Sequence, residues 1–385
     1  MFSSDYKILV LFGTRPECIK LAPVIAELKK RAIPTVVVSS SQHTDLLRPF
    51  LELFNINVDH DLAVMTENQT PNGVCAKVLS GLDAIIDKEN PSAIIVQGDT
   101  TTAFAGAFAA FNRKIAIGHV EAGLRSGDPY SPFPEEMNRR LISQMATFHF
   151  AATHDNCNNL WQEGVSENKI FATGNTVVDA LQFILKNCAP GESLLEILRE
   201  TEGKRRILLT THRRESFGDK MSENLRAIRE FVERHEDVCL LFPVHPNPNV
   251  RAAARHVLGD CDRIRLLEPM GYTNFVSLMK EAWLIVSDSG GVQEEAPSLG
   301  RPVLILRENT ERPEAVETGV AKLVGDNSLA AMLEENYNDG SWVESVKTVA
   351  NPFGDGMAAR RIVDVLAEAF KGEPSGAKVV IADAK

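Results

Sequence analysis

Short apolar runs alternate with longer stretches of mixed polarity along most of the chain. The runs at 8–12 (ILVLF) and 93–96 (AIIV) contain no polar residue, which is typical of strands covered on both faces of a parallel sheet. The stretches between such runs have the length of helices. The pattern therefore predicts a repeated β-α-β alternation, with helices on both faces of each sheet.

The predicted strands are 7–12, 34–39, 93–97, 114–118, 149–152 and 169–172 in the first half, and 206–210, 238–243, 263–267, 282–287, 302–306 and 322–324 in the second. The helices predicted in the first half include 19–30, 74–88, 101–111 and 135–145. Between the halves lies a polar segment at 187–204, which contains Pro190-Gly191 and a run of charges, within a crossing region near 174–204. We place the domain boundary there, and the length of 385 residues fits two domains.

The composition and charge of the chain exclude some classes of binding partner. The formal net charge of −11 repels polyanions, so we expect no nucleic-acid partner and no anionic membrane partner. The longest apolar stretch, 103–111, is far short of the roughly 20 residues that a membrane span needs. The N-terminus shows no signal-peptide pattern, and the six cysteines form no C-x-x-C pair. We expect a cytoplasmic protein with reduced thiols.

The first predicted strand ends in Gly13-Thr14-Arg15-Pro16-Glu17, and Lys20 follows in the next helix. Backbone amides at a helix start, together with Arg15 and Lys20, suit an anion such as phosphate. The alternative is an ordinary solvated helix start. The motif is not G-x-G-x-x-G, and no acidic residue stands where a dinucleotide ribose would be bound, so we expect no NAD.

In the first half, carboxylates stand after two predicted strands and at the start of one predicted helix. Asp99 comes at the tip of the third strand, Glu121 follows the fourth, and Glu135 and Glu136 open the next helix. An Asp before a helix is often only an N-cap, and acidic residues in a first turn often only complement the helix dipole. Glu121 stands among apolar and small residues, where a carboxylate is costly unless it has a partner or a chemical role.

Two histidines stand at strand ends in the second half. His212 is followed by Arg213 and Arg214, which suits an anion, and His245 lies among prolines. For both, a structural hydrogen-bonding role is the alternative. The sequence has no paired His spacing and no His/Cys cluster, so we expect no metal site.

The strongest phosphate signal is Ser289-Gly290-Gly291, where a strand gives way to a helix. Glycines let a diphosphate approach the backbone, and the helix start adds partial positive charge; a tight structural turn is the alternative. Glu295 suits a ribose diol, Phe275 offers a ring to a base, and Arg312 adds a cation.

Together these segments resemble the non-hydrolysing UDP-N-acetylglucosamine 2-epimerases, in order from about Lys7 to about Gly325. The motifs that carry the resemblance are GTRPE-x-IK, QGDTTTAF, HVEAGLRSGD, SPFPEEMNRR, THRRESFGD, PVHPNPNV and SDSGGVQEEAPSLGRPVL. The resemblance implies the GT-B fold, two Rossmann-like doubly wound domains facing a cleft, whose last helix returns to the first domain. We therefore expect domain 1 at 1–174, completed by a helix at about 357–371, and domain 2 at 175–356.

The resemblance implies reversible conversion of UDP-GlcNAc to UDP-ManNAc, by anti elimination of UDP to a 2-acetamidoglucal and re-addition, with no redox cofactor. It makes Asp99, Glu121 and Glu135 the acid and base groups and leaves open which of them removes the C2 proton. The other implied contacts to the UDP-sugar are Arg15, Lys20 and His212 at the departing UDP, Ser289, Gly290, Gly291 and Arg312 at its phosphates, Glu295 at its ribose, and Phe275 with the main chain near Met270 at its uracil.

Many bacterial members of that family bind a second, activating UDP-GlcNAc. Gln42, Glu136, Arg213 and His245 match that allosteric site, but Asp45 replaces a usual glutamine and Asn68 a usual arginine. Losing a cation and gaining a carboxylate weakens a diphosphate contact. We expect an enzyme that is either unregulated or acts on a modified sugar such as a 2,3-diacetamido uronic acid.

The resemblance further implies a homodimer that serves cell-surface polysaccharide biosynthesis. Three other functions stay open at this point: a GT-B glycosyltransferase, a hydrolysing epimerase, and a nucleotide-sugar sensor without activity.

Overall fold

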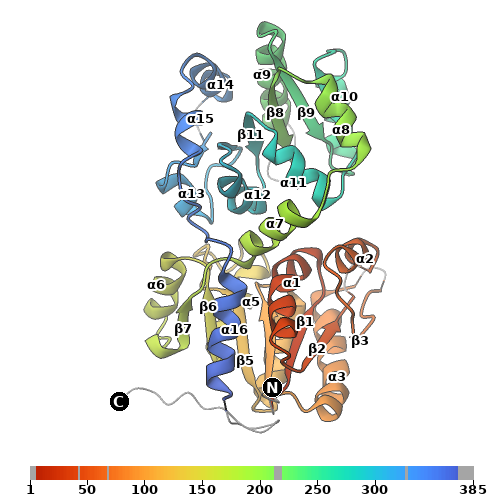
Figure 1. The fold of residues 1–385 in the computed structure, drawn as a ribbon, viewed down its shortest axis with the longest axis vertical. Helices are drawn as coiled ribbons and strands as arrows, with labels where there is room; N and C mark the ends of the chain where they lie inside the picture. Colours follow the sequence, from red (N-terminus) through yellow and green to blue (C-terminus); the bar gives the residue numbers. More distant parts are fainter. Residues whose placement is uncertain (1–5, 42–43, 67–68, 212–218, 326–327, 372–385) are drawn as a thin grey trace. The chain divides into compact units, whose positions relative to one another are not determined.

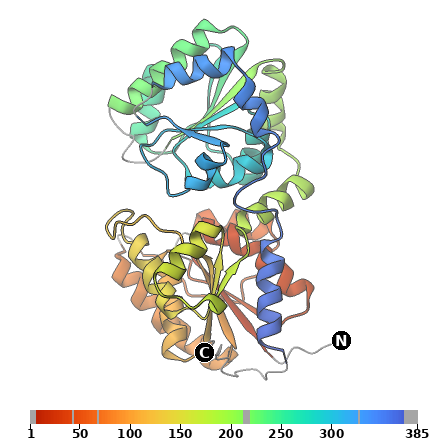
Figure 2. The ribbon, with the colours of Figure 1, turned by 90° about the vertical axis from the view of Figure 1, so that its left-hand side faces the viewer.

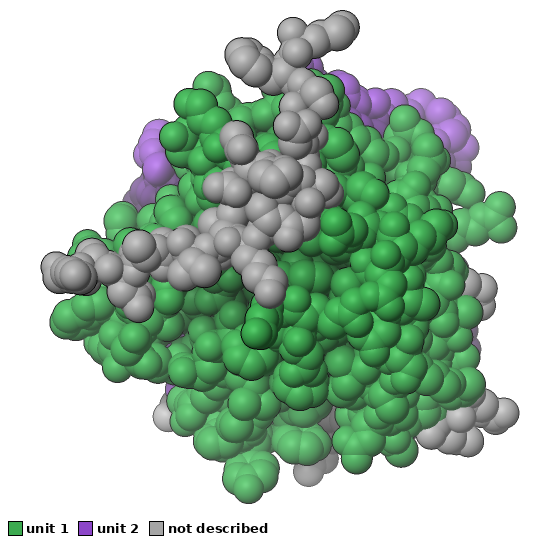
Figure 3. All heavy atoms as spheres, turned by 90° about the horizontal axis from the view of Figure 1, so that it is seen from below, with its two compact units in different colours: residues 1–180, 353–385 green, residues 181–352 purple. Residues whose placement is uncertain are grey.

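The computed structural model describes residues 6–41, 44–66, 69–211, 219–325 and 328–371, with 44–46 and 219 in backbone only. The chain divides into two compact units, residues 1–180 with 353–385, and residues 181–352. Figure 3 colours this division on the heavy atoms. Sequence reasoning placed the corresponding boundaries after 174 and 356, and the structure places them after 180 and 352.

The described residues of unit 1 form a seven-stranded parallel sheet in the order β3-β2-β1-β4-β5-β6-β7. Its strands are β1 (Ile8–Phe12), β2 (Thr35–Ser39), β3 (His60–Asp61), β4 (Ala93–Gln97), β5 (Ala116–Ala122), β6 (Phe148–Ala151) and β7 (Ile170–Ala172). Its helices are α1 (Arg15–Lys30), α2 (Thr44–Leu53), α3 (Pro71–Glu89), α4 (Thr101–Asn112), α5 (Glu135–Met145), α6 (His154–Gln162), η1 (Glu167–Lys169) and α16 (Ala358–Ala369), with α7 (Thr176–Asn187) running across the boundary into unit 2.

Helices cover both faces of this sheet. α3, α4 and α5 pack in a row, and α1 packs between α2 and α16. Within unit 1, α3 and α16 lie on opposite sides of the sheet (Figures 1 and 2). The strands β1 and β4 between them are fully buried, which explains why their sequences carry almost no polar residue.

The last described helix, α16, belongs to unit 1 although it follows all of unit 2 in the sequence. Phe370, just past its end, is fully buried and stacks on Tyr6 with ring centroids 5.3 Å apart. At its other end, the carboxylate of Asp179 accepts hydrogen bonds from the backbone amides of Ala358 and Ala359 at 3.2 and 2.9 Å. Helix α16 is therefore held in unit 1 by apolar packing at one end and by hydrogen bonds from its first amides at the other.

Unit 2 contains a six-stranded parallel sheet in the order β10-β9-β8-β11-β12-β13. Its strands are β8 (Arg205–Thr210), β9 (Val238–Pro243), β10 (Ile264–Leu267), β11 (Leu284–Ser287), β12 (Val303–Ile305) and β13 (Ala321–Leu323). Its helices are α8 (Glu192–Glu200), α9 (Asp219–Arg234), α10 (Pro248–Leu258), α11 (Tyr272–Lys280), α12 (Gly290–Glu295), η3 (Ala296–Leu299), α13 (Pro313–Glu317), α14 (Leu329–Asn338) and α15 (Ser341–Val346). Side chains of α9, α10 and α14 complete its main apolar core.

The predicted fold class, two Rossmann-like doubly wound parallel sheets, is confirmed. β4 and β9 have the predicted bounds, whereas the strand predicted at 114–118 is wrong at both ends and covers Ala116–Ala122. It continues because β6 pairs with it as far as Ala122, a tertiary contact that no local pattern reveals. The short strand β3 and the helix α2 were not predicted. None of the described helices has the length and apolar character needed to cross a membrane.

Candidate active site

The carboxyl ends of β4 and β5 meet at one edge of the unit 1 sheet, because the two strands are parallel neighbours. The turn after β4 contains Gly98, with a φ of +68°, followed by Asp99. Gly98 N donates to Val120 O of β5 at 2.9 Å. Residues that follow different strands in the sequence are thereby held at the place where open α/β sheets bind ligands.

Asp99 does not cap helix α4, so the alternative N-cap role is wrong. The N-cap is Thr100, whose side chain accepts from Ala103 N at 3.0 Å. The carboxylate of Asp99 pairs instead with the guanidinium of Arg139, and its side chain is about a quarter exposed. Asp99 thus presents a partly open carboxylate at the strand end.

Glu121 lies within β5, at an irregularity in the pairing with β6, and has a φ of +64°. A residue other than glycine rarely adopts this left-handed backbone conformation, because it costs free energy. Residues strained in this way cluster at functional sites. The bulge turns the carboxylate toward Lys20, Gln97 and Asn175, which all donate hydrogen bonds to it. A carboxylate on a strained backbone with three polar partners has the features of a catalytic group.

The predicted anion turn after β1 has a different local arrangement from the one expected. The amides of Gly13 and Thr14 donate to Glu17 Oε2 at 3.0 and 2.8 Å, so a carboxyl group of the protein itself accepts the hydrogen bonds expected to go to a bound anion. Lys20 is buried and forms an ion pair with Glu121. Arg15, the exposed first residue of α1, lies 5.7 Å from the ring centre of Phe50. The two predicted cations therefore occupy very different environments.

Glu17 is a residue that sequence reasoning did not single out. It is almost fully buried, and its second carboxylate oxygen accepts from Thr100 Oγ1 at 2.7 Å. Burial raises the pKa of Glu17, although hydrogen bonds from Thr100, Thr14 and Gly13 oppose this effect. Glu17 joins the turn after β1 to the turn that carries Asp99. The T-x-x-E spacing of a capping box was the signal that could have revealed it.

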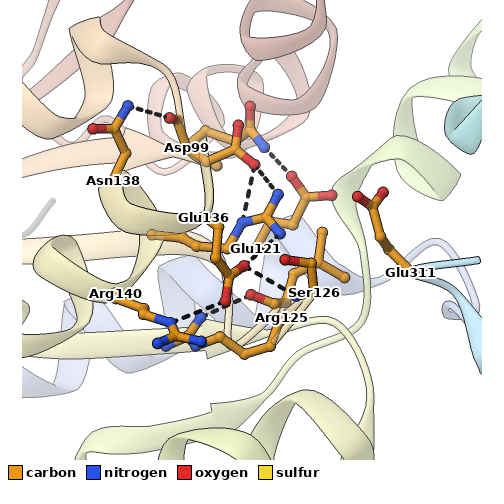
Figure 4. Close-up of polar contacts among 12 residues, drawn as sticks. Asp99, Glu121, Arg125, Ser126, Glu136, Asn138, Arg140 and Glu311 are labelled. Carbon is orange, nitrogen blue, oxygen red and sulfur yellow. Dashed lines mark hydrogen bonds and ion pairs between the residues drawn. The ribbon is translucent and has the colours of Figure 1, made fainter. Parts of the chain in front are cut away.

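Helix α5 contributes several charged residues (Figure 4). Glu135, its first residue, is half-buried, and Glu136 is completely buried. The carboxylate of Glu136 accepts from Ser126 N at 3.0 Å, from Arg139 at 3.1 Å and from Arg140 at 2.9 Å. Burial opposes ionisation, but these donors together hold the pKa of Glu136 below its ordinary value. Glu136 is therefore an internal anion of unit 1.

In unit 2, the predicted Ser289-Gly290-Gly291 segment follows β11 and starts α12, with Ser289 as N-cap and the two glycines as the first residues of the helix. A Cβ atom at Gly290 would lie 2.6 Å from Arg312 Cζ, so the guanidinium packs directly on the backbone here, and a larger residue would displace it. Arg312 is held by Glu294 at 2.7 Å and by Glu311 at 3.1 Å. The turn and the cation thus form one structural group.

Other predicted contact residues of unit 2 lie around α11. Glu295, at the end of α12, is buried and accepts from Tyr272 Oη at 3.0 Å. Phe275 lies in α11 and is half-buried, and Met270 lies in the loop that precedes this helix. Tyr272 was not predicted from the sequence, and it links α11 to Glu295.

The structure describes the predicted allosteric residues in part. His245 follows β9, and its Nδ1 accepts from Asn247 N at 3.2 Å. The remaining residues predicted from the sequence, namely Gln42, the side chain of Asp45, Asn68, His212 and Arg213, lie outside the described residues.

The family profile described as UDP-N-acetylglucosamine 2-epimerase matches residues 26–367. The chain belongs to this family. Its members are isomerases, so the family predicted from the motifs, and the class of enzyme, are confirmed.

Relatives of the UDP-N-acetylglucosamine 2-epimerase family match this chain over nearly its full length. The enzyme of that name from Bacillus subtilis is 45% identical over 363 residues, covering 94% of each protein. The one from Escherichia coli K12 is 42% identical over 368 residues, covering 94% of this chain and 98% of the relative. Only about 6% of this chain lies outside each match.

Solved structures of the family agree in fold. The UDP-GlcNAc 2-epimerase of Neisseria meningitidis bound to UDP-GlcNAc has a TM-score of 0.85 and 41% identity, covering 94% of this chain and all of the other. The Methanocaldococcus jannaschii enzyme in complex with UDP-GlcNAc and UDP has a TM-score of 0.76 and 37% identity, covering 94% and 99%.

Proposed function

We propose that this protein interconverts UDP-GlcNAc and UDP-ManNAc by epimerisation at C2. The observation that carries the proposal is the Glu121 carboxylate, held on a left-handed backbone at the end of β5 beside the turn that presents Asp99. Family membership and the complexes of its relatives with UDP-GlcNAc support the same substrate. The reaction needs a base and an acid at the sugar, which these carboxylates supply.

The proposed reaction has two balanced steps. A carboxylate removes the C2 proton while the C1–O bond to the diphosphate breaks, and the electron pair of the C–H bond becomes the C1=C2 double bond of a 2-acetamidoglucal. UDP leaves with the electrons of the C1–O bond. A proton is then delivered to the opposite face of C2, and UDP re-adds at C1. Asp99, Glu121 and Glu135 are the proposed acid and base groups, without an assignment of which removes the proton.

Two cations of unit 1, Lys20 and Arg15, are proposed for the leaving-group step. Lys20 pairs with Glu121, so its charge is already directed to this strand end. Arg15 is exposed at the start of α1. Both are proposed to stabilise the departing diphosphate. His212 is proposed for the same role on the resemblance alone, because it lies outside the described residues.

Unit 2 supplies the proposed UDP contacts. The backbone amides of Ser289, Gly290 and Gly291 suit the phosphates, with Arg312 packed against the turn. Glu295 suits the ribose diol. Phe275 and the loop at Met270 are proposed to contact the uracil. Glycine at 290 is consistent with close approach of both a guanidinium and a diphosphate.

Several finer points stay proposals. The sugar is either UDP-GlcNAc or a modified relative such as a 2,3-diacetamido uronic acid, because Asp45 and Asn68 depart from the family's second-site pattern. A homodimer in the cytoplasm, serving cell-surface polysaccharide biosynthesis, is implied by the resemblance. Light scattering on the purified full chain tests the dimer.

Proton NMR in D2O tests the reaction. Incubation with UDP-GlcNAc is expected to introduce deuterium at C2 as UDP-ManNAc accumulates. Release of free sugar would indicate a hydrolysing epimerase, and an unchanged spectrum would contradict the proposal. A requirement for an added acceptor would indicate a glycosyltransferase. Parallel reactions with the 2,3-diacetamido uronic acid nucleotide decide between the two substrates.

Two variants sharpen this assay. Asp99→Asn is expected to abolish deuterium exchange while the Kd for UDP, measured by calorimetry, changes less than about threefold, because Asp99 is proposed to act at the sugar and not on the UDP. Asp87→Asn removes an exposed carboxylate of α3 that pairs with Arg113, and is expected to leave turnover unchanged. Full turnover in the Asp99 variant would refute its assignment.

A further inference from the structure

Two consecutive residues of α5 hold Asp99 at two separate points. Arg139 donates from Nε to Asp99 Oδ2 at 3.2 Å and from Nη2 to the same oxygen. Asn138 Nδ2 donates to the main-chain oxygen of Asp99 at 2.8 Å. Side chain and backbone of Asp99 are therefore fixed together, and both anchors come from one helix turn (Figure 4).

The guanidinium of Arg139 is itself fixed. Its side chain is 5% exposed, and its Nη1 donates to Glu136 Oε2 at 3.1 Å. Glu136 in turn is held by Ser126 N and by Arg140. Because each member of this chain of contacts has a second partner, the orientation of Arg139 does not depend on Asp99 alone. A planar guanidinium can serve two acceptors in this way, whereas a lysine ammonium has no such fixed geometry.

The contact with Arg139 uses only Oδ2 of the Asp99 carboxylate and leaves Oδ1 for proton transfer. Both nitrogens of Arg139 approach Oδ2, and no described residue donates a hydrogen bond to Oδ1. The Asp99 side chain is 26% exposed, against 5% for Arg139. The carboxylate thus has one oxygen anchored by Arg139, while the other accepts from no described residue, which is the arrangement expected of a positioned proton-transfer group.

The same helix carries another proposed catalytic carboxylate. Glu135 begins α5, and Arg139 follows it by four residues, which places both on one face of the helix. Holding Asp99 to this turn therefore also sets its position relative to Glu135. Asp99 lies in the turn after β4 and Glu135 lies in α5, and the side chains of Asn138 and Arg139 join that turn to the helix.

We propose that Arg139, assisted by Asn138, is a positioning residue that holds Asp99 in register with Glu135 for proton transfer at the sugar. This role rests on the proposed epimerase function. Arg139 does not touch the substrate; it acts through Asp99. Its loss therefore slows the chemical step and leaves the binding of UDP intact, because the groups proposed to bind UDP lie elsewhere.

Steady-state kinetics of Arg139→Lys and Arg139→Gln test the role. Both variants are expected to lower kcat by at least about thirtyfold while KM for UDP-GlcNAc and Kd for UDP change less than about threefold. Arg140→Gln is the matched control, because Arg140 is the next residue, shares Glu136 and does not contact Asp99. It is expected to retain at least a third of the activity. Circular dichroism checks that each variant is folded at the assay temperature.

A double-mutant cycle in urea, with Asp99→Asn and Arg139→Gln, separates failure of this inference from failure of the proposed function. Coupling on the order of tenfold in the unfolding constant is expected for residues in contact. A wild type without epimerase activity would refute the proposed function, and the cycle would still decide whether the anchor exists. Additive effects in urea, or equal kcat losses for Arg139→Gln and Arg140→Gln, would overturn the positioning role.

Discussion

The carboxylate of Glu121 lies against the backbone of Gly98. A Cβ atom at position 98 would be 3.4 Å from Glu121 Oε2. Both residues have a positive φ, +68° for Gly98 and +64° for Glu121. The turn that presents Asp99 and the bulge that presents Glu121 are therefore in contact, and the residue that the Glu121 carboxylate approaches has no side chain.

Gly98→Ala is expected to reduce turnover at least about tenfold and to destabilise the fold by ~1 to 2 kcal/mol, the cost of a left-handed backbone at a residue with a Cβ. The new methyl would make only an ordinary van der Waals contact with Glu121 Oε2 at 3.4 Å, so the activity loss comes from relaxation of the strained backbone at 98, which shifts the neighbouring Asp99. Gly164→Ala is the control, because Gly164 has a φ of +86° and no neighbouring atom within 4 Å of the place that a methyl group would take. It should lose similar stability in urea and keep its turnover; equal activity losses would contradict the explanation.

Glu17→Ala is expected to lower the free energy of unfolding by ~2 kcal/mol or more, because it leaves the donors of Gly13, Thr14 and Thr100 without their buried acceptor. Glu17→Gln retains an acceptor oxygen for the two amides, and its loss should stay below ~1 kcal/mol. Urea titrations of the three proteins measure this difference. Similar losses for both variants would mean that the charge, rather than the hydrogen bonds, carries the effect.

Gly290→Ala is expected to raise the Kd for UDP at least about tenfold, the scale of one charge-assisted hydrogen bond. The new methyl would meet the Arg312 guanidinium at 2.6 Å and turn it away from the turn. Gly340→Ala, in a position with no atom within 4 Å, should leave the Kd unchanged. Isothermal titration calorimetry compares the two, and an unaltered Kd in the Gly290 variant would show that Arg312 does not act at the phosphates.

The stability of unit 1 is expected to depend on pH through Asp179. Burial raises the pKa of Asp179 from 3.8 to about 6, although the amides of Ala359 and Ala358 favour its charged form. Between these values the folded protein keeps a proton that the unfolded chain has lost. The contribution of Asp179 is therefore full below pH 3.8 and lost as the pH rises through about 6.

The pKa difference of about two units corresponds to ~3 kcal/mol. Asp179→Asn removes this titration. Urea unfolding at about pH 4.5 and about pH 7.5, on either side of the folded-state pKa, should show that the wild type loses stability relative to the variant as the pH rises. A constant difference between the two proteins over that range would refute the assignment.

β4 and β5 show which strand bounds a local sequence pattern can predict and which it cannot. β4 was predicted with its observed bounds because its apolar run is bounded by Gln97-Gly98. β5 was predicted to stop at 118, but pairing with β6 carries it through the bulge to Ala122. Likewise Asp99 and Thr100 are both good N-cap residues, and the structure shows that Thr100 caps the helix while Asp99 pairs with Arg139.

The sequence by itself determined the two parallel-sheet halves, the family, and the placement of Asp99 and Ser289–Gly291 just after strands, because apolar periodicity and motif order can be read along the chain. The tertiary structure alone decided the partners: Lys20 for Glu121, Arg139 for Asp99, Glu17 for the amides after β1. The physical reason is that these contacts join elements far apart in the sequence, and a buried charge takes the partner that the fold brings within hydrogen-bonding distance.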